Sequence, residues 1–212
     1  VWTDRPALSC EPLWELEPKF AGYTRAEKLE KVREKMNELG ADVFVIPALD
    51  EIAWLLNLRG GDVLYTPVFL SYLLLERGKA TLCVQKEAVS AEIEAHLAAD
   101  GVALAPYDDI YPLVASLPKG TRVLLDGERA NYRITQSVGT GVETIDRPSP
   151  IQLMKAMKHP VEQENERIAH IRDGVAVTRF IYWLKHTIGK ETITEMSAAK
   201  KLESLRAEGE HL

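Results

Sequence analysis

The segment from Thr24 to Pro47 constrains the fold of this chain more than any other. "TRAEKLEKVREKMNELG" begins with Thr24 and carries Glu27 three residues later, the capping-box pattern of a helix N-terminus. Gly40 suits the position just after such a helix. The apolar side chains that repeat at helical spacing are Leu29, Val32, Met36 and Leu39. "ADVFVIPA" then predicts a strand ending at Pro47, and a helix joined tightly to a strand is typical of an α/β layer.

Strand and helix patterns continue to alternate as far as residue 146. "TPVFLSYLLLERGKATLCVQ" predicts two strands joined by a hairpin at 76–79, whereas "DEIAWLLNL" fits either a helix or a strand. Further strands are predicted from "VALAPYDD", "TRVLLDGE" and "VETID", and helices from "SAEIEAHLAADG", "DIYPLVASLPKG" and "RANYRITQSV". Connections of both hairpin and helix length occur, so we expect a mixed sheet of about six strands flanked by helices.

The pattern changes at Pro148 and Pro150, which mark a domain boundary. Residues 151–158 read as a short strand or helix, and Pro160 opens a long helix that reaches Ile188. Its predicted buried stripe consists of Ile168, Ile171, Val175, Phe180, Ile181, Leu184 and Ile188. One more helix follows in "TITEMSAAKKLESLRAEG". This helical tail is too small to hold a core of its own, so we expect it to begin a further domain.

The predicted organisation therefore has three parts. Residues 1–21, rich in proline and aromatic side chains, form a strap or linker from a preceding domain. Residues 22–148 form the α/β domain, and residues 149–212 form the first part of a second domain. The N-terminus has neither a basic nor an apolar signal region, and the chain reads as an excerpt of a longer protein.

Charge and cysteine usage narrow the range of partners. The net charge of −6 provides no electrostatic footprint for nucleic acid or an anionic membrane surface. No apolar run approaches the roughly 18 residues of a membrane-spanning helix. Cys10 and Cys83 lie far apart and in no metal-binding spacing, which suits free thiols in a reducing, cytoplasmic compartment, although one disulfide stays open.

No sequence motif supplies a catalytic centre. The histidines are scattered and form no HExxH pattern, so no metal site is predicted. Asp108 and Asp109 would point to opposite faces of a strand and read better as helix caps. GxSxG and GxGxxG are both missing, and neither cysteine has a histidine nearby in sequence.

One loop nevertheless carries a candidate binding site. In "NLRGGDVLY", Arg59 precedes two glycines, which allow positive φ and a close approach of the backbone. Asp62 is predicted to clamp Arg59, with Tyr65 and Asn57 completing a polar rim. An arginine held in this way would bind a carboxylate or a peptide carbonyl. The alternative is that the pair of Arg59 and Asp62 only pins the loop.

Several segments resemble the large, three-domain Xaa-Pro aminopeptidases (aminopeptidase P). "ALDEIAWLLNLRGGDVLYTPVFLSYLLL" is similar to their middle domain, and "WTDRP" looks like the strand leaving their first domain. "AHIRDGVAVTRFIYWL" and "TITEMSAAKKLESLR" look like the first two helices of their catalytic domain. Gly61 departs from the serine found in many members, which should loosen the loop without removing Arg59 or Asp62.

The resemblance implies a creatinase-like α/β domain followed by the start of a "pita-bread" catalytic domain. It implies a metal-dependent hydrolase that releases the N-terminal residue from peptides with proline second, using two divalent ions, usually manganese. The family's metal ligands come after the point where this sequence ends, so no metal or catalytic residue is expected in this chain, which alone should be inactive. Arg59, Asp62 and Tyr65 then become candidate substrate-binding residues on the cleft wall. Dimers are usual in the relatives, so a homodimer is open for the parent protein.

Two alternatives stay open at this point. The same fold occurs without metals in peptide- or histone-binding proteins, so the chain could belong to an inactive binding module. It could also belong to a prolidase or creatinase relative, although "WTDRP" and "NLRG" favour the larger aminopeptidase form. Residues beyond Leu212 would separate enzyme from binder.

Overall fold

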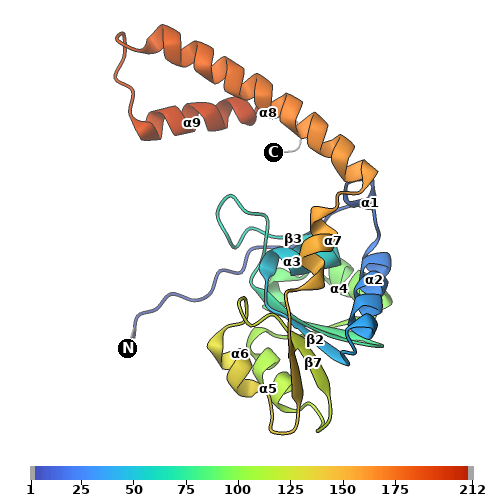
Figure 1. Ribbon diagram of the computed structural model, residues 1–212. Coiled ribbons are helices and arrows are strands. Elements are labelled where there is room, and N and C mark those ends of the chain that lie inside the picture. Colours follow the sequence, from blue (N-terminus) through green and yellow to red (C-terminus); the bar gives the residue numbers. More distant parts are fainter. Residues whose placement is uncertain (1–2, 210–212) are drawn as a thin grey trace. The chain divides into compact units, whose positions relative to one another are not determined.

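The computed structural model describes residues 3–209 of the 212-residue chain and divides it into two compact units (Figure 1). Unit 1 ends at Lys158, and unit 2 begins at His159. No helix among the described residues has the length and hydropathy required to cross a bilayer.

The core of unit 1 is a six-stranded mixed sheet in the order β6-β5-β4-β2-β7-β8. Its strands are β2 (Val43–Ile46), β4 (Ser71–Glu76), β5 (Ala80–Val84), β6 (Val102–Pro106), β7 (Arg122–Leu125) and β8 (Glu143–Asp146). β4 pairs antiparallel with both β2 and β5, which confirms the predicted hairpin, whereas the β2–β7, β7–β8 and β5–β6 pairs are parallel. The predicted mixed sheet with flanking helices is confirmed.

Alternating side chains of the strands supply two apolar layers, one on each face of the sheet. Phe44 and Ile46 of β2 point to one face, while Val43 and Val45 point to the other. The first face is covered by α2 (Arg25–Glu38), α3 (Leu49–Leu56), α4 (Ala91–Ala99) and α7 (Pro150–Ala156) (Figure 1). The second face is covered by α5 (Ile110–Ala115) and α6 (Tyr132–Ser137) (Figure 1). The capping box predicted for Thr24 and Glu27 is present at the start of α2.

The segment before α2 is bound to the body of unit 1. It contains β1 (Trp14–Glu15), which pairs antiparallel with β3 (Leu58–Arg59), and the short helix α1 (Pro18–Ala21). Leu13 is 7% exposed and belongs to the core of the first face. That residues 1–21 link to a preceding domain stays a prediction.

The division between the units differs from the predicted boundary at residue 149. Residues 150–156 form the helix α7, and its Ile151 is fully buried in the core of unit 1. The two prolines in "RPSP" suggested a domain boundary, but Pro150 occupies the first turn of α7, where its missing N–H costs nothing.

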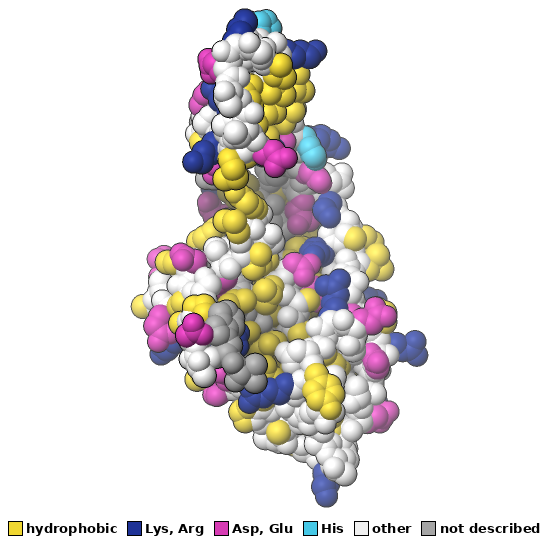
Figure 2. Space-filling view, turned by 90° about the vertical axis from the view of Figure 1, so that its left-hand side faces the viewer, with side chains coloured by type: hydrophobic (Ala, Val, Ile, Leu, Met, Phe, Trp, Pro, Cys, Tyr) yellow, Lys and Arg dark blue, Asp and Glu magenta, His cyan; other side chains and the backbone are white. Residues whose placement is uncertain are grey.

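Unit 2 consists of α8 (Pro160–Thr187) packed against α9 (Glu195–Arg206). Ion pairs between Arg206 and Asp173 (2.7 Å) and between Arg179 and Glu208 (2.6 Å) join the segments. The predicted buried stripe of α8 is wrong for most of its residues: those more than a third exposed are Ile168, Ile171, Val175, Ile181 and Ile188. Hydrophobic side chains accordingly appear on the surface of the helical unit, at the top of Figure 2. Helical periodicity identifies an apolar face, but it does not determine what covers that face.

Candidate functional site

The loop that carries Arg59 begins at the C-terminus of α3. The sequence left "DEIAWLLNL" open between helix and strand; the structure makes it α3, a turn at Asn57 and β3. Asn57 adopts the left-handed conformation (φ 52°), which asparagine tolerates better than most residues. Its side chain is 5% exposed, accepts from Lys28 Nζ (2.7 Å) and donates to Tyr23 O (2.8 Å). Asn57 therefore fixes the turn from inside, and its predicted place on a polar rim is wrong.

Arg59 folds back onto the helix that precedes it. Its Nη1 donates to Ala53 O (2.8 Å) and Leu58 O (2.9 Å), while the side chain stays partly exposed. A cation near the last carbonyls of a helix is favoured by the helix dipole. The guanidinium is thus oriented by one backbone carbonyl in the last turn of α3 and one in β3.

Asp62 closes the base of the loop and does not act as the predicted clamp on Arg59. Its Oδ1 accepts from Glu11 N (3.0 Å), and its Oδ2 accepts from Leu70 N (2.8 Å). Sequence spacing suggested an Arg–Asp pair three residues apart, but both carboxylate oxygens bind backbone amides from distant segments. Asp62 therefore fixes both ends of the loop and ties it to the N-terminal segment.

Tyr65 lies at the exposed tip of this loop, which projects from unit 1 between β3 and β4 (Figure 1). The tip is a tight turn with a bridge between Val63 and Thr66, and Tyr65 has a positive φ of 62°. Tyr65 is 88% exposed and Leu64 is 77% exposed. No charged residue occurs from Val63 to Phe69, so the tip presents an uncharged, partly aromatic surface.

The two glycines of the loop have different roles. A Cβ on Gly60 would lie 2.8 Å from Phe69 Cβ and 3.0 Å from Leu13 Cδ2, so Gly60 permits a close approach of three segments. A Cβ on Gly61 would meet Glu11 only at 3.4 Å, an ordinary contact. Neither glycine has a positive φ. The need for a glycine at position 60 therefore comes from the close approach of its neighbours and not from its backbone conformation.

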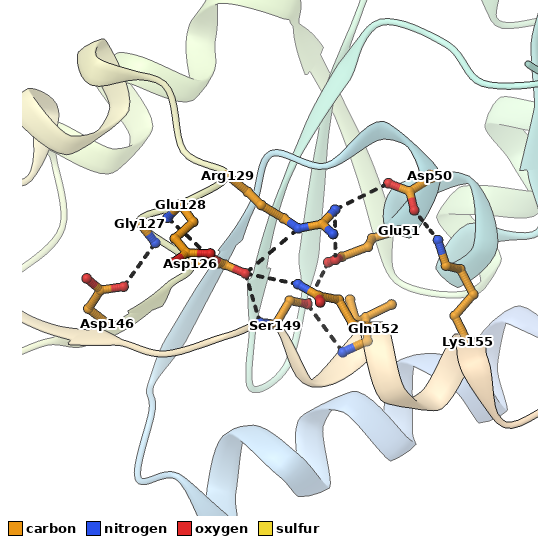
Figure 3. Close-up of polar contacts among 11 residues, drawn as sticks. Asp50, Glu51, Asp126, Gly127, Glu128, Arg129, Asp146, Ser149, Gln152 and Lys155 are labelled. Atoms are coloured by element: carbon orange, nitrogen blue, oxygen red, sulfur yellow. Dashed lines mark hydrogen bonds and ion pairs between the residues drawn. The ribbon is translucent and has the colours of Figure 1, made fainter.

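A second polar group, which the sequence did not predict, lies where β2 and β7 end (Figure 3). These neighbouring parallel strands lead to helices on opposite faces of the sheet, α3 and α6, which is the arrangement of a topological switch point. The carboxylates at this point come from Asp50, Glu51 and Asp126, and the cations from Arg129 and Lys155. The signal available in the sequence was acidic residues directly after two apolar strand runs, "IPALDE" and "VLLDGE".

The switch-point cluster fastens α7 to the sheet. Ser149 caps α7, its N donates to Asp126 Oδ2 (3.1 Å) and its Oγ donates to Glu51 Oε2 (2.5 Å). Lys155 of α7 is ion-paired with Asp50 at the start of α3. These contacts are drawn in Figure 3, and they explain why α7 belongs to unit 1.

Glu51 is the member of this cluster whose carboxylate is buried with incomplete hydrogen bonding. The residue is 1% exposed, and its Oε1 has no hydrogen-bond partner; the nearest cation, Arg129 Nη1, is 3.7 Å away. Burial is the largest influence and raises the pKa of Glu51, although the Ser149 hydrogen bond and Arg129 act in the opposite direction. Ionised Glu51 therefore costs stability in the folded state.

This cost predicts a pH dependence. Because the pKa of Glu51 is raised on folding, its stabilising contribution is complete below its unfolded pKa of about 4.3 and is lost as the pH rises through the folded value. The unfolding free energy of wild type relative to that of Glu51→Gln should therefore fall as the pH rises from acidic to neutral. Urea unfolding across this range measures it. Glu128→Gln, at an exposed carboxylate beside Asp126, is the control; parallel curves for wild type and Glu51→Gln would contradict the prediction.

Residues suited to metal or nucleophilic chemistry are dispersed. Within residues 3–209, no three histidine, cysteine or acidic side chains converge in a way that could hold a metal ion. Both cysteines are unpaired, and burial raises the pKa of Cys83 to about 12, which keeps it a thiol. His159 caps α8 by accepting from Val161 N (3.1 Å).

Comparison with known families and proteins extends over most of the chain. The model of the creatinase/prolidase N-terminal domain matches residues 4–162. A probable Xaa-Pro aminopeptidase P of Neurospora crassa is 35% identical over 220 residues, covering 98% of this chain and 32% of the relative. Xaa-Pro aminopeptidase 1 of Dictyostelium discoideum is 37% identical over 196 residues, covering 90% and 31%. The chain thus spans about a third of the length of these curated relatives.

Solved structures give the same relationship. An X-prolyl aminopeptidase from Caenorhabditis elegans, described as a cytosolic enzyme with a di-nuclear active site, superposes with a TM-score of 0.89 at 30% identity. The match covers 99% of this chain and 35% of that enzyme. A prolidase from Pyrococcus horikoshii, with a TM-score of 0.56 and 19% identity over 86% of this chain and 48% of the prolidase, shares the fold.

Proposed function

This chain belongs to the creatinase/prolidase N-terminal domain family, and from that membership we propose that its parent protein is a metal-dependent Xaa-Pro aminopeptidase. The parent would release the N-terminal residue from peptides that have proline in second position. The observation that carries this proposal is the 0.89 TM-score and 30% identity with the worm X-prolyl aminopeptidase across 99% of the chain. The named relatives favour an enzyme over the binding module, and the similarity to prolidases supports only the fold.

The parent would use two divalent ions, with manganese as the proposed metal. The di-nuclear site described for the worm relative supports the number of ions. Such ions would supply Lewis-acid chemistry, lowering the pKa of a bound water and polarising the scissile carbonyl. We place their ligands outside this chain, in the part of the parent that this sequence does not cover, and we propose that α8 and α9 open the pita-bread domain that carries them. The cytosolic description of the worm enzyme supports a cytoplasmic location for the parent. We also propose that the parent forms a homodimer.

This chain would supply the substrate-side surface, through the loop from Arg59 to Tyr65. The exposed ring of Tyr65 and the side chain of Leu64 offer the flat apolar contact that proline-containing segments prefer. Arg59, oriented by the carbonyls of Ala53 and Leu58, would meet a peptide carbonyl or carboxylate. Asp62 would act indirectly, because its carboxylate holds the loop closed.

The division of labour between chain and parent can be tested by activity. The 212-residue chain with manganese should give no turnover of an Xaa-Pro tripeptide, whereas the full-length parent should be active and should lose activity when a chelator removes the metal. In the parent, Tyr65→Ala should raise KM several-fold with little change in kcat, because it removes binding that the ground and transition states share. Tyr132→Ala, at another exposed tyrosine, is the matched control. Turnover by the chain itself would overturn the proposed location of the metal site.

A further inference from the structure

The segment from Ser9 to Glu17, here called the N-terminal strap, is hydrogen-bonded along its length to the rest of unit 1. β1 in its middle pairs with β3, so that Trp14 lies opposite Arg59. Its further backbone bonds run from Leu13 N to Ala88 O (2.9 Å) and from Leu16 N to Asn57 O (2.8 Å). The strap therefore lies directly beside the loop from Arg59 to Tyr65.

The position of that loop depends on the strap. Glu11 N donates to Asp62 Oδ1 (3.0 Å), and Asp62 in turn receives the Leu70 amide that closes the loop. Leu13 packs against Gly60 so closely that a Cβ on Gly60 would lie 3.0 Å from it. If the strap leaves, Asp62 loses one of its two amide donors and Gly60 loses its packing partner.

One cluster of charges holds the C-terminal part of the strap. Glu15 of β1 accepts from Arg25 Nη2 (2.5 Å) through one oxygen and lies 2.7 Å from His96 Nδ1 through the other. Arg25 is 6% exposed and also donates to Leu56 O (2.8 Å) and Asp100 Oδ2 (2.8 Å). Arg25 is thus fixed by three partners, whereas the contact of His96 with Glu15 lies at the surface.

His96 is the group in this cluster whose ordinary pKa lies nearest to neutral pH. It faces Glu15 of β1 and the cation of Arg25 from α2, and Glu92 of its own helix adds a further negative charge. The hydrogen bond to Glu15 is the largest influence and raises the pKa of His96. Protonated His96 and the Glu15 carboxylate form an ion pair, whereas neutral His96 offers the carboxylate only an uncharged donor.

We propose that His96 and Glu15 form a pH-responsive latch that holds the N-terminal strap against the loop from Arg59 to Tyr65. Because a raised histidine pKa stabilises the folded contact at low pH, the latch is closed below about pH 6.5 and weakens as the pH rises through the folded-state value. The functional consequence, a substrate-side loop whose position responds to pH, rests on the function proposed above. The latch itself is a property of unit 1.

Amide hydrogen exchange of the 212-residue chain between about pH 6 and pH 9, corrected for intrinsic exchange, tests the latch. Protection of the Glu11, Leu16 and Leu70 amides should fall by about two- to fivefold as the pH rises in wild type. In His96→Gln, the glutamine side chain can still donate to Glu15 but does not titrate. Protection of the same three backbone amides should therefore not change with pH in this variant. His186→Gln, which alters an exposed histidine of α8, should behave like wild type.

Three results would overturn the proposal. The first is that protection of the strap amides in wild type is independent of pH. The second is that their protection in His96→Gln depends on pH as it does in wild type. The third is that protection of the Leu70 amide stays constant while that of the strap amides changes. The last result would separate the strap from the loop. Because the measurement needs neither peptide nor metal, its outcome does not depend on whether the parent is an aminopeptidase.

Discussion

Replacing Arg25 with alanine should lower the free energy of unfolding of unit 1 by about 3 kcal/mol, because the change strips a buried cation from two carboxylates and a carbonyl. Arg25 is 6% exposed, while Glu15 and Asp100 keep side-chain exposures of 30% and 31%. Truncation leaves both carboxylates partly desolvated without their counter-ion. It also removes the donor to Leu56 O, at the turn that leads into β3. The effect should therefore exceed that of a surface ion pair.

Urea unfolding followed by tryptophan fluorescence measures this loss. Arg77→Ala is the matched control, because Arg77 pairs with Asp42 at 2.8 Å but is 57% exposed and should cost less than about 1 kcal/mol. We further expect Arg25→Ala to weaken protection of the Leu16 amide, since the strap loses its main charged anchor. Equal costs for the two arginine variants would mean that the buried cluster contributes no more than a solvated pair.

Phe69→Ala should be similarly severe, at about 3–5 kcal/mol, because it empties the space beneath the candidate loop. Phe69 is fully buried, belongs to the main core and lies so near Gly60 that a Cβ added there would be 2.8 Å from Phe69 Cβ. Val68 and Phe69 anchor the loop from Asp62 to Leu70 in the core, while its tip is solvent-exposed. Removing this anchor should therefore loosen the loop as well as destabilise the domain.

The conservative substitution Phe69→Leu keeps an apolar side chain in the same space and should cost about 1 kcal/mol. Unfolding free energies of the two variants, together with exchange of the Leu70 amide, measure both effects. We expect Leu70 to lose protection in Phe69→Ala beyond what global destabilisation explains. If both variants cost the same, the aromatic ring does not support the loop.

Most of the fold could be predicted from local patterns. The capping box of Thr24 and Glu27, the hairpin between β4 and β5 and the proline start of α8 depend on residues within one turn of one another. Such signals depend little on tertiary context, so most helices and strands of unit 1 follow from them. The failure at α8 is of another kind: its apolar stripe exists, but burial requires a second surface that periodicity does not specify.

The candidate site was predicted only in part. The loop with Arg59, Asp62 and Tyr65 stands out in the sequence through its glycines and its charges, and the structure places all three residues on it. The partners of those side chains could not be predicted. Asp62 binds the backbone amides of Glu11 and Leu70, and Glu11 lies far from it in sequence. Glu51 was missed altogether, since nothing near it in sequence identifies Ser149 as its hydrogen-bond partner.

The sequence by itself determined most of the helices and strands and their apolar faces, because those properties depend on neighbours within a few residues. It left α3 and α7 open between helix and strand and did not identify β1. The tertiary structure decided which charged side chains meet: Glu15 with Arg25 and His96, and Glu51 with Ser149 and Arg129. These encounters depend on strand order and on the face to which each connection turns. Both are settled by packing between distant segments, which no local spacing encodes.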